Sequence, residues 1–110
     1  MRQGYIFMAY LDPAIGSSQG GRRPVVIISG DMVNKFTPNV VVCPMTTSIK
    51  NYHGDVIIKP SENNGLKKKS EILNIHVRSI SKSSLKECIG CKSNSEISQI
   101  HEGINDVFKL

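Results

Sequence analysis

The chain has 110 residues and a formal net charge of +5, with 39% hydrophobic and 21% charged residues. This length favours one domain, residues 1–110, with a modest hydrophobic core, and the composition excludes a disordered chain. No apolar run approaches the roughly 20 residues that a membrane-spanning helix needs. Three cysteines and no apolar leader segment predict a cytoplasmic protein without a disulfide framework.

The positive charge is concentrated in residues 1–92, which carry 13 Lys/Arg against 6 Asp/Glu. A basic body can attract a polyanion such as nucleic acid, although charge alone is explained equally simply by a solvated surface. Tryptophan is absent and only 5% of residues are aromatic. Stacking of bases on aromatic side chains is therefore not expected to dominate nucleic-acid binding.

Short apolar runs separated by turn residues predict a series of strands. A helical turn is expected at 31–34, and a short turn or helix at 83–87. Within the fifth strand, Asn74, His76 and Arg78 share one face, which is expected to look into a cleft. The expected strands are 4–11, 24–29, 40–45, 55–59 and 70–80, with a last short one at 88–90.

The C-terminal segment predicts a helix over about 95–108. Ser93 is a candidate N-cap, and Glu96 three residues later completes a capping box. Apolar residues then recur at helical spacing and form one stripe. Closely spaced strands with one terminal helix predict a mainly β, α+β fold: a small, curled, largely antiparallel domain whose helix packs on the sheet.

The residues 16–24 form a glycine-rich polar segment directly before an apolar strand. Its glycines allow the backbone to approach a ligand, and Arg22 and Arg23 carry guanidinium groups that fork onto phosphate oxygens. Pro24 restricts the residue before it to an extended conformation, so the Arg23 side chain leaves the segment in a limited range of directions. An ordinary surface position for both arginines remains the alternative.

Two further polar groups stand at the ends of apolar runs. Thr46, Thr47 and Ser48 follow the third predicted strand, and His76 and Arg78 lie on the fifth. Together with Arg23 they would suit attack on a phosphodiester, in which an RNA 2′-hydroxyl is aligned and the developing charge is neutralised without a metal or cofactor. Each feature also has an ordinary interpretation as a strand-ending turn or a structural side chain.

A metal site is not expected. Cys88 and Cys91 have the spacing of half a zinc knuckle, but a structural zinc site needs four ligands and no second pair follows. The run at 67–69 is expected to be a solvated loop tip, with a phosphate-backbone contact as the alternative.

The ordered set of segments resembles the MazF/PemK (Kid-like) toxins of bacterial toxin–antitoxin systems. The resemblance runs from Gly4 to the terminal helix and includes the segments 4–13, 16–29, 34–38, 40–48 and 76–85. It implies an SH3-like β-barrel with a C-terminal helix that forms a homodimer. It also implies a metal-independent endoribonuclease, or mRNA interferase. Such an enzyme cuts single-stranded RNA to leave 2′,3′-cyclic phosphate and 5′-hydroxyl ends, and an acidic, MazE-like antitoxin blocks it.

Carried onto this sequence, the resemblance assigns catalytic roles to Arg23 and Thr46. It places the loop serine and glutamine of the family at Ser17 and Gln19. The remaining candidate substrate-binding residues are those named above: Arg22, Thr47, Ser48, His76 and Arg78.

The chain departs from the family pattern at four places. Ser18 and Tyr5 replace acidic residues, His76 replaces a glutamine, and Leu73 and Ile75 stand where Kid-like members have Arg and Asp. His76 could therefore alter base preference or transfer a proton. Two other functions stay open: a CcdB-like protein that binds DNA gyrase through residues 108–110, and a catalytically inactive RNA-binding module.

Overall fold

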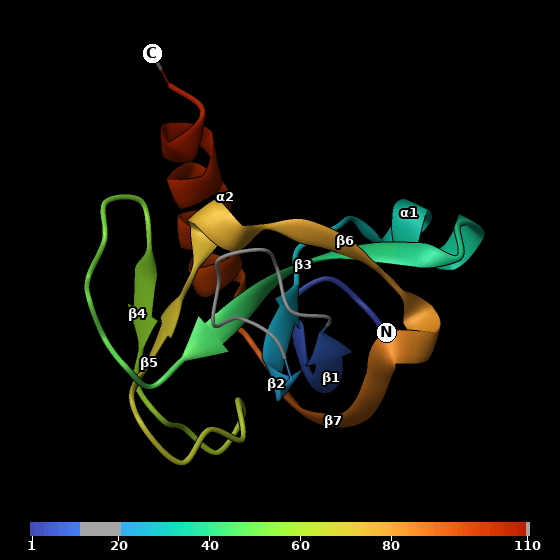
Figure 1. The fold of residues 1–110 in the computed structure, drawn as a ribbon, viewed down its shortest axis with the longest axis horizontal. Coiled ribbons are helices and arrows are strands. Elements are labelled where there is room, and N and C mark those ends of the chain that lie inside the picture. Colours follow the sequence, from blue (N-terminus) through green and yellow to red (C-terminus); the bar gives the residue numbers. More distant parts are fainter. Residues whose placement is uncertain (12–20, 110) are drawn as a thin grey trace.

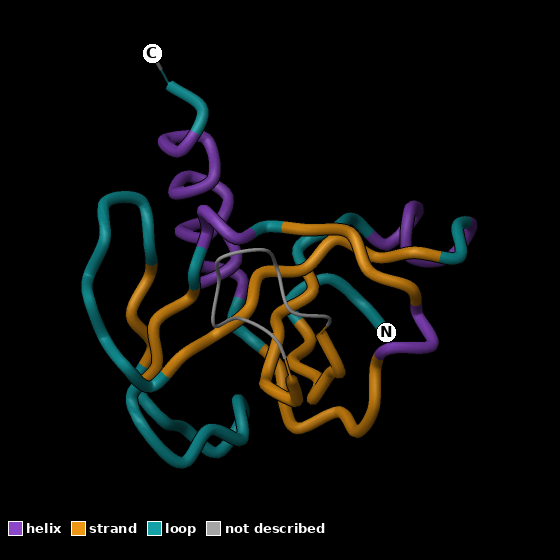
Figure 2. The backbone as a smooth tube through the Cα atoms, viewed as in Figure 1, coloured by secondary structure: helices purple, strands orange, loops and turns teal. Residues whose placement is uncertain are grey.

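A computed structural model describes residues 1–11 and 21–109 (Figure 1). Seven strands and two α-helices make up most of this part of the chain, and the tube in Figure 2 shows that strand predominates. Helix α1 (Asp31–Phe36) and helix α2 (Asn94–Val107) lie at opposite sides of the sheet. No helix in the described ranges is long and apolar enough to cross a membrane. The strands are β1 (Tyr5–Leu11), β2 (Gly21–Ile27), β3 (Asn39–Thr46), β4 (Val56–Ile58), β5 (Ser70–Ile72), β6 (Arg78–Ser81) and β7 (Leu85–Cys91).

All pairs in the sheet are antiparallel, in the order β4-β5-β3-β2-β1-β7, with β6 pairing the other half of β3. The mainly β architecture with a terminal helix is confirmed. The structure does not show the closed barrel that the resemblance implies. Strands β4 and β7 stand at opposite ends of the strand order, so the sheet is open. Strand β3 is long enough to pair β2 on one side and both β5 and β6 on the other, so it connects the whole sheet.

The central strands are buried on both faces, which explains their continuous apolar runs. In β2, Val25 and Ile27 enter one core cluster while Val26 enters the other. In β3, Val42 enters the same cluster as Val25 and Ile27, and Cys43 enters the same cluster as Val26. The first cluster packs beneath α2 (Ile6, Val26, Cys43, Met45, Ile58, Ile72 and Ile100) and the second lies on the opposite face (Ala9, Leu11, Val25, Ile27, Val40, Val42 and Ile80).

The predicted C-terminal helix is confirmed to within one residue at each end. Ser93 accepts a hydrogen bond from the Glu96 N–H, and the Glu96 carboxylate accepts one from the Ser93 N–H, so the capping box is complete. The buried Ile100 anchors α2 in the first core cluster. Gly103 faces the sheet side of α2, where its backbone lies against Gly54.

The largest difference from prediction is in the expected strand 70–80. It is two strands, β5 and β6, separated by the 3₁₀-helix η1 (Asn74–His76). The buried Asn74 explains the break. Its backbone N–H donates a hydrogen bond to the Asp55 carboxylate and its side-chain amide donates one to the Gly54 carbonyl, so its backbone cannot continue the ladder. A side-chain partner thus overrides the local strand pattern.

Two other strands begin earlier than predicted. Strand β2 starts at Gly21 rather than Pro24, so both arginines lie on a strand and not in the loop before it. Strand β7 covers Leu85–Cys91 rather than a short segment. Pairing with β1, which the local sequence does not reveal, extends both strands.

We predict that Gly103→Ala destabilises the protein, although alanine is the better helix former. A β-carbon at Gly103 would overlap the Gly54 carbonyl and the Asn74 side-chain amide, and overpacking of this kind costs about 1–3 kcal/mol. Urea unfolding measures the free energy of unfolding. Gly30→Ala is the control, because a β-carbon at Gly30 meets nothing within 4 Å. Equal stability of the two variants would contradict the close helix–sheet approach.

Candidate active site

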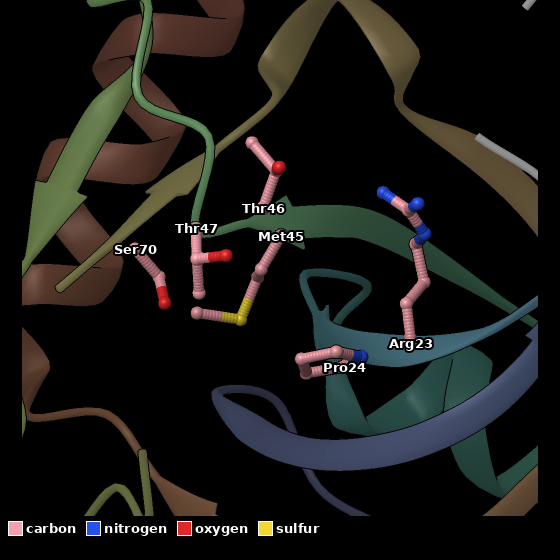
Figure 3. A pocket seen from close by; sticks show the side chains of 6 residues that line it. All are labelled: Arg23, Pro24, Met45, Thr46, Thr47 and Ser70. Atoms are coloured by element: carbon pink, nitrogen blue, oxygen red, sulfur yellow. The ribbon is translucent and has the colours of Figure 1, made fainter. Parts of the chain in front are cut away.

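The candidate site begins with a row of residues across three neighbouring strands. Val25 of β2 pairs with Pro44 of β3 as the last pair of this ladder, and Arg23 and Thr46 each lie two residues beyond it. On the other side of β3, Thr46 pairs with Glu71 of β5. Residues directly opposite in an antiparallel pair share a face of the sheet. Figure 3 shows the Arg23 and Thr46 side chains projecting to the same side, while Met45 turns away.

Two cavities are each lined by both Arg23 and Thr46. The smaller, about 190 Å³, is also lined by Pro24, Met45, Thr47 and Ser70 (Figure 3). The larger, about 430 Å³, is lined by Arg23, Thr46, Ser48, Lys50, Tyr52, Leu73 and His76. A third cavity shares Tyr52 and His76 with the larger one and extends the hollow toward the end of α2.

The Thr46 hydroxyl is oriented by its own turn. Its oxygen accepts a hydrogen bond of 3.1 Å from the Ser48 N–H, so the first residues after β3 fold around it. The hydroxyl hydrogen and a second lone pair remain available to a ligand. Thr46 can therefore donate a hydrogen bond to a phosphate or ribose oxygen while it is held in place.

The structure brings together five of the predicted site residues: Arg23, Thr46, Thr47, Ser48 and His76 all line the two cavities. Arg22 points to the other face of β2 and forms an exposed ion pair with Glu87 of β7. Arg78 begins β6, opposite Val42, and lines neither cavity. Ser17 and Gln19 lie outside the described residues.

Three residues of the site were missed by sequence reasoning. Lys50 and Tyr52 belong to the connection between β3 and β4, which carries no motif of its own. Glu71 was hidden in the strand pattern. Its signal was a carboxylate directly before the apolar pair Ile72-Leu73, since a charged residue inside a buried strand needs partners.

The buried Glu71 and the half-buried Asp55 form an acidic pair behind the site. Glu71 is fully buried, and its carboxylate accepts three backbone N–H bonds, which together with the neighbouring Asp55 lower its pKa despite burial. The pKa of Asp55 is raised to about 7, mainly by burial and also by the neighbouring Glu71. Asp55 is thus the member of the pair that keeps its proton to the higher pH.

The three cysteines differ in their surroundings: Cys43 is buried, Cys91 is half-buried and Cys88 is exposed. Burial raises the pKa of the Cys43 thiol to about 12, and it donates to the Asn74 side-chain oxygen. All three cysteines are free thiols. No group of three or more His, Cys, Asp or Glu side chains that could hold a metal is found within 1–11 and 21–109.

Comparison with known proteins identifies the family. Residues 2–108 match the family model described as PemK-like, MazF-like toxin of type II toxin-antitoxin system. The chain belongs to this family. Among curated relatives, a protein named Endoribonuclease MazF from Staphylococcus saprophyticus is 35% identical over 106 residues, covering 96% of this chain and 88% of its own length.

Solved structures of MazF-type toxins have the same fold. The Mycobacterium tuberculosis toxin MazF-mt6 superposes with a TM-score of 0.80 at 27% identity, covering 96% of this chain and 97% of its own. An endoribonuclease from a mycobacterial species, solved in complex with its cognate antitoxin, gives a TM-score of 0.79 at 19% identity, with 96% and 92% covered. The resemblance inferred from the sequence is confirmed.

We predict that Asp55→Asn gains stability relative to the wild type as pH rises from about 5 to about 8. The folded state keeps the Asp55 proton up to about pH 7, whereas the unfolded chain releases it near the ordinary pKa of 3.8, so the stabilising contribution of this proton is lost as pH rises through that window. The lowered pKa of Glu71 acts only below the ordinary value of 4.5. Urea unfolding of both proteins across this range measures the difference, and a difference independent of pH would contradict the assignment.

Proposed function

We propose that this chain is a metal-independent endoribonuclease that cleaves single-stranded RNA. The observation that carries the proposal is that Arg23 and Thr46, just beyond the end of the β2–β3 ladder, project to the same side and line the same cavities. The family and the curated relative named as an endoribonuclease support it. A guanidinium and a hydroxyl suffice to bind a phosphodiester and its ribose.

In the proposed reaction the RNA 2′-oxygen attacks the adjacent phosphorus. The P–O2′ bond forms and the P–O5′ bond breaks, which leaves a 2′,3′-cyclic phosphate and a 5′-hydroxyl. The proton lost from the 2′-oxygen and the proton gained by the 5′-oxygen balance the step. Arg23 neutralises the charge that grows on the non-bridging oxygens, and Thr46 orients the attacking ribose by hydrogen bonding.

His76 is the proton-transfer candidate. Its side chain lines the cavity shared with Arg23 and Thr46, and imidazole is the side chain that most often moves protons near neutral pH. In this role it would take or return the proton at one of the two ribose oxygens. The same position would let it contact a base next to the cleaved bond.

The cellular role we propose is that of a bacterial cytoplasmic toxin that acts as a homodimer and is neutralised by an acidic antitoxin. The family and the mycobacterial toxin–antitoxin complex support the antitoxin. The excess of Lys and Arg over residues 1–92 also favours an acidic, disordered segment as the partner. Sedimentation of the purified chain, alone and with its co-expressed partner, tests both assemblies.

We predict that Arg23→Ala lowers kcat/KM for a long single-stranded RNA by about 100- to 1000-fold, as loss of one charge-stabilising donor does elsewhere. The assay contains excess EDTA, and the cut ends are mapped. Arg22→Ala is the matched comparison, because the neighbouring side chain lies on the other face and pairs with Glu87. Its effect should stay below about tenfold, since an exposed ion pair contributes little.

Equal losses in Arg22→Ala and Arg23→Ala would reject the site. Intact RNA with a folded wild type would reject the function and favour the gyrase-binding or inactive alternatives. In the gyrase alternative, truncation after residue 107 should abolish binding, because that interaction would use residues at the end of α2, where Phe108 is exposed.

We also predict that His76→Gln reduces kcat by at least about tenfold, because glutamine keeps hydrogen bonding and loses proton transfer. Rates and cut positions are measured together on the same RNA. Unchanged kcat with shifted cut positions would assign His76 to base recognition alone. Unchanged rates and positions would remove it from the site.

A further inference from the structure

Glu71 is a charged side chain in a place where charge is costly. It lies at the centre of the three-residue strand β5 and is fully buried. It pairs with Ile57 of β4 on one side and with Thr46 of β3 on the other. A buried carboxylate destabilises a fold unless its oxygens accept hydrogen bonds, so its partners indicate what it does.

The partners are three successive backbone amides of the connection between β3 and β4. Oε1 accepts from the Lys50 N–H at 2.6 Å and the Asn51 N–H at 2.8 Å, and Oε2 accepts from the Tyr52 N–H at 3.0 Å. Asn51 adopts a left-handed conformation, with φ of 56°. Successive amides that converge in this way form an anion-binding nest, and here the anion is a side chain of the protein itself.

The anchored segment is a wall of the candidate site. Lys50 and Tyr52 are exposed, and their side chains line the larger cavity together with Arg23, Thr46 and His76. Glu71 therefore joins two parts of the site: its backbone pairs with Thr46, and its carboxylate holds the segment that carries Lys50 and Tyr52. The carboxylate itself is covered by this segment and does not line the cavity.

We propose that Glu71 is a positioning residue for RNA cleavage, which holds Lys50 and Tyr52 against the Arg23–Thr46 row so that they bind the RNA beside the cleaved bond. The inference rests on the proposed endoribonuclease function. Lys50 supplies a cation for a phosphate and Tyr52 a ring on which a base stacks. Holding both in advance lowers the entropy lost when RNA binds.

Asp55 completes the anchor by holding the proton that lets two carboxyl groups share one buried site. Its Oδ1 accepts from the Asn74 N–H at 2.9 Å, its Oδ2 is buried without a hydrogen-bond partner among the described residues, and the neighbouring Glu71 adds to burial in raising its pKa. The ionisable groups around it are Glu71 from β5 and Cys43 from β3, while η1 presents the Asn74 amide and α2 the Gly103 backbone next to Gly54. Loss of this proton places two negative charges together, which weakens the hold on the segment 50–52.

The first test of the anchor does not depend on activity. Amide hydrogen exchange of residues 50–52 is measured in the wild type and in Glu71→Gln, in which one acceptor oxygen becomes a donor that faces the same amides. We expect faster exchange of these amides in the variant, with protection of α2 retained. Glu102→Gln, which removes an exposed carboxylate on α2, is the matched control and should leave the three amides protected. Unchanged protection in Glu71→Gln would overturn the anchor.

The second test asks whether the anchor acts through Lys50 and Tyr52. In Glu71→Gln we expect KM for RNA to rise roughly tenfold with a smaller change in kcat, because RNA contacts are lost before the chemical step. Lys50→Ala and Tyr52→Ala should each raise KM in the wild type and have little further effect in Glu71→Gln. A side chain that only stabilises the fold would give independent, multiplicative effects. Such effects, or an unchanged KM, would overturn the positioning role.

A third variant keeps the proposal testable if Glu71→Gln does not fold. Asp55→Asn replaces the proton of the pair with a permanent donor. We expect the ratio of kcat/KM at about pH 8.5 to that at about pH 6.5 to be larger in this variant than in the wild type, because its anchor does not ionise. Equal ratios would overturn the contribution of Asp55. If the wild type leaves RNA intact, the proposed function and the cleavage role fail together, while the exchange data still decide the anchor.

Discussion

Burial of the central strands on both faces is the constraint from which the rest of this structure follows. Strands β2 and β3 place alternate residues into two apolar clusters, so neither face of their central part can carry polar groups at low cost. Polar side chains are therefore displaced to the strand ends. Arg23 near the start of β2 and Thr46 at the end of β3 line the same cavities because antiparallel strands bring a start and an end to the same edge.

The same constraint explains the buried acid behind the site. Strand β5 continues the row beyond Thr46, and at its centre stands Glu71 in place of an apolar residue. Its charge is compensated locally by three amides, and the neighbouring Asp55 carries a proton rather than a second charge. Arg23, the cation of the row, lines a cavity whose other polar side chains include Lys50 and His76. The cationic side chains of Arg23 and Lys50 in one cavity suit a polyanionic ligand.

The proposed cleavage needs little of the protein beyond placement. A phosphodiester is cleaved by its own 2′-hydroxyl once attacking and leaving oxygens are aligned and charge is neutralised, so the fold must hold a cation and a few hydrogen-bonding groups rigidly. Sheet residues such as Arg23 and Thr46 provide that rigidity. Residues 50–52 lie outside the sheet, and the bonds to Glu71 give this segment a comparable fixed position.

The local pattern of the sequence was sufficient for the elements that depend on neighbouring residues. The helix α2 follows from its capping box and apolar stripe, and β1 and β3 follow from apolar runs closed by turn residues. Arg23 and Thr46 were identifiable because their motifs are local: a proline follows the arginine, and a short polar cluster contains the threonine.

Only the tertiary structure decided how distant residues pair. It ended the predicted strand 70–80 at Asn74, whose partners Gly54 and Asp55 are about 20 residues away in the chain. It also separated Arg22 from Arg23, because sheet pairing extended β2 and alternation sent the two side chains to opposite faces. The sequence by itself determined the terminal helix, most of the strands and the Arg23 and Thr46 groups of the candidate site. Strand register and long-range hydrogen bonds, which no local pattern encodes, determined which of those groups share a cavity.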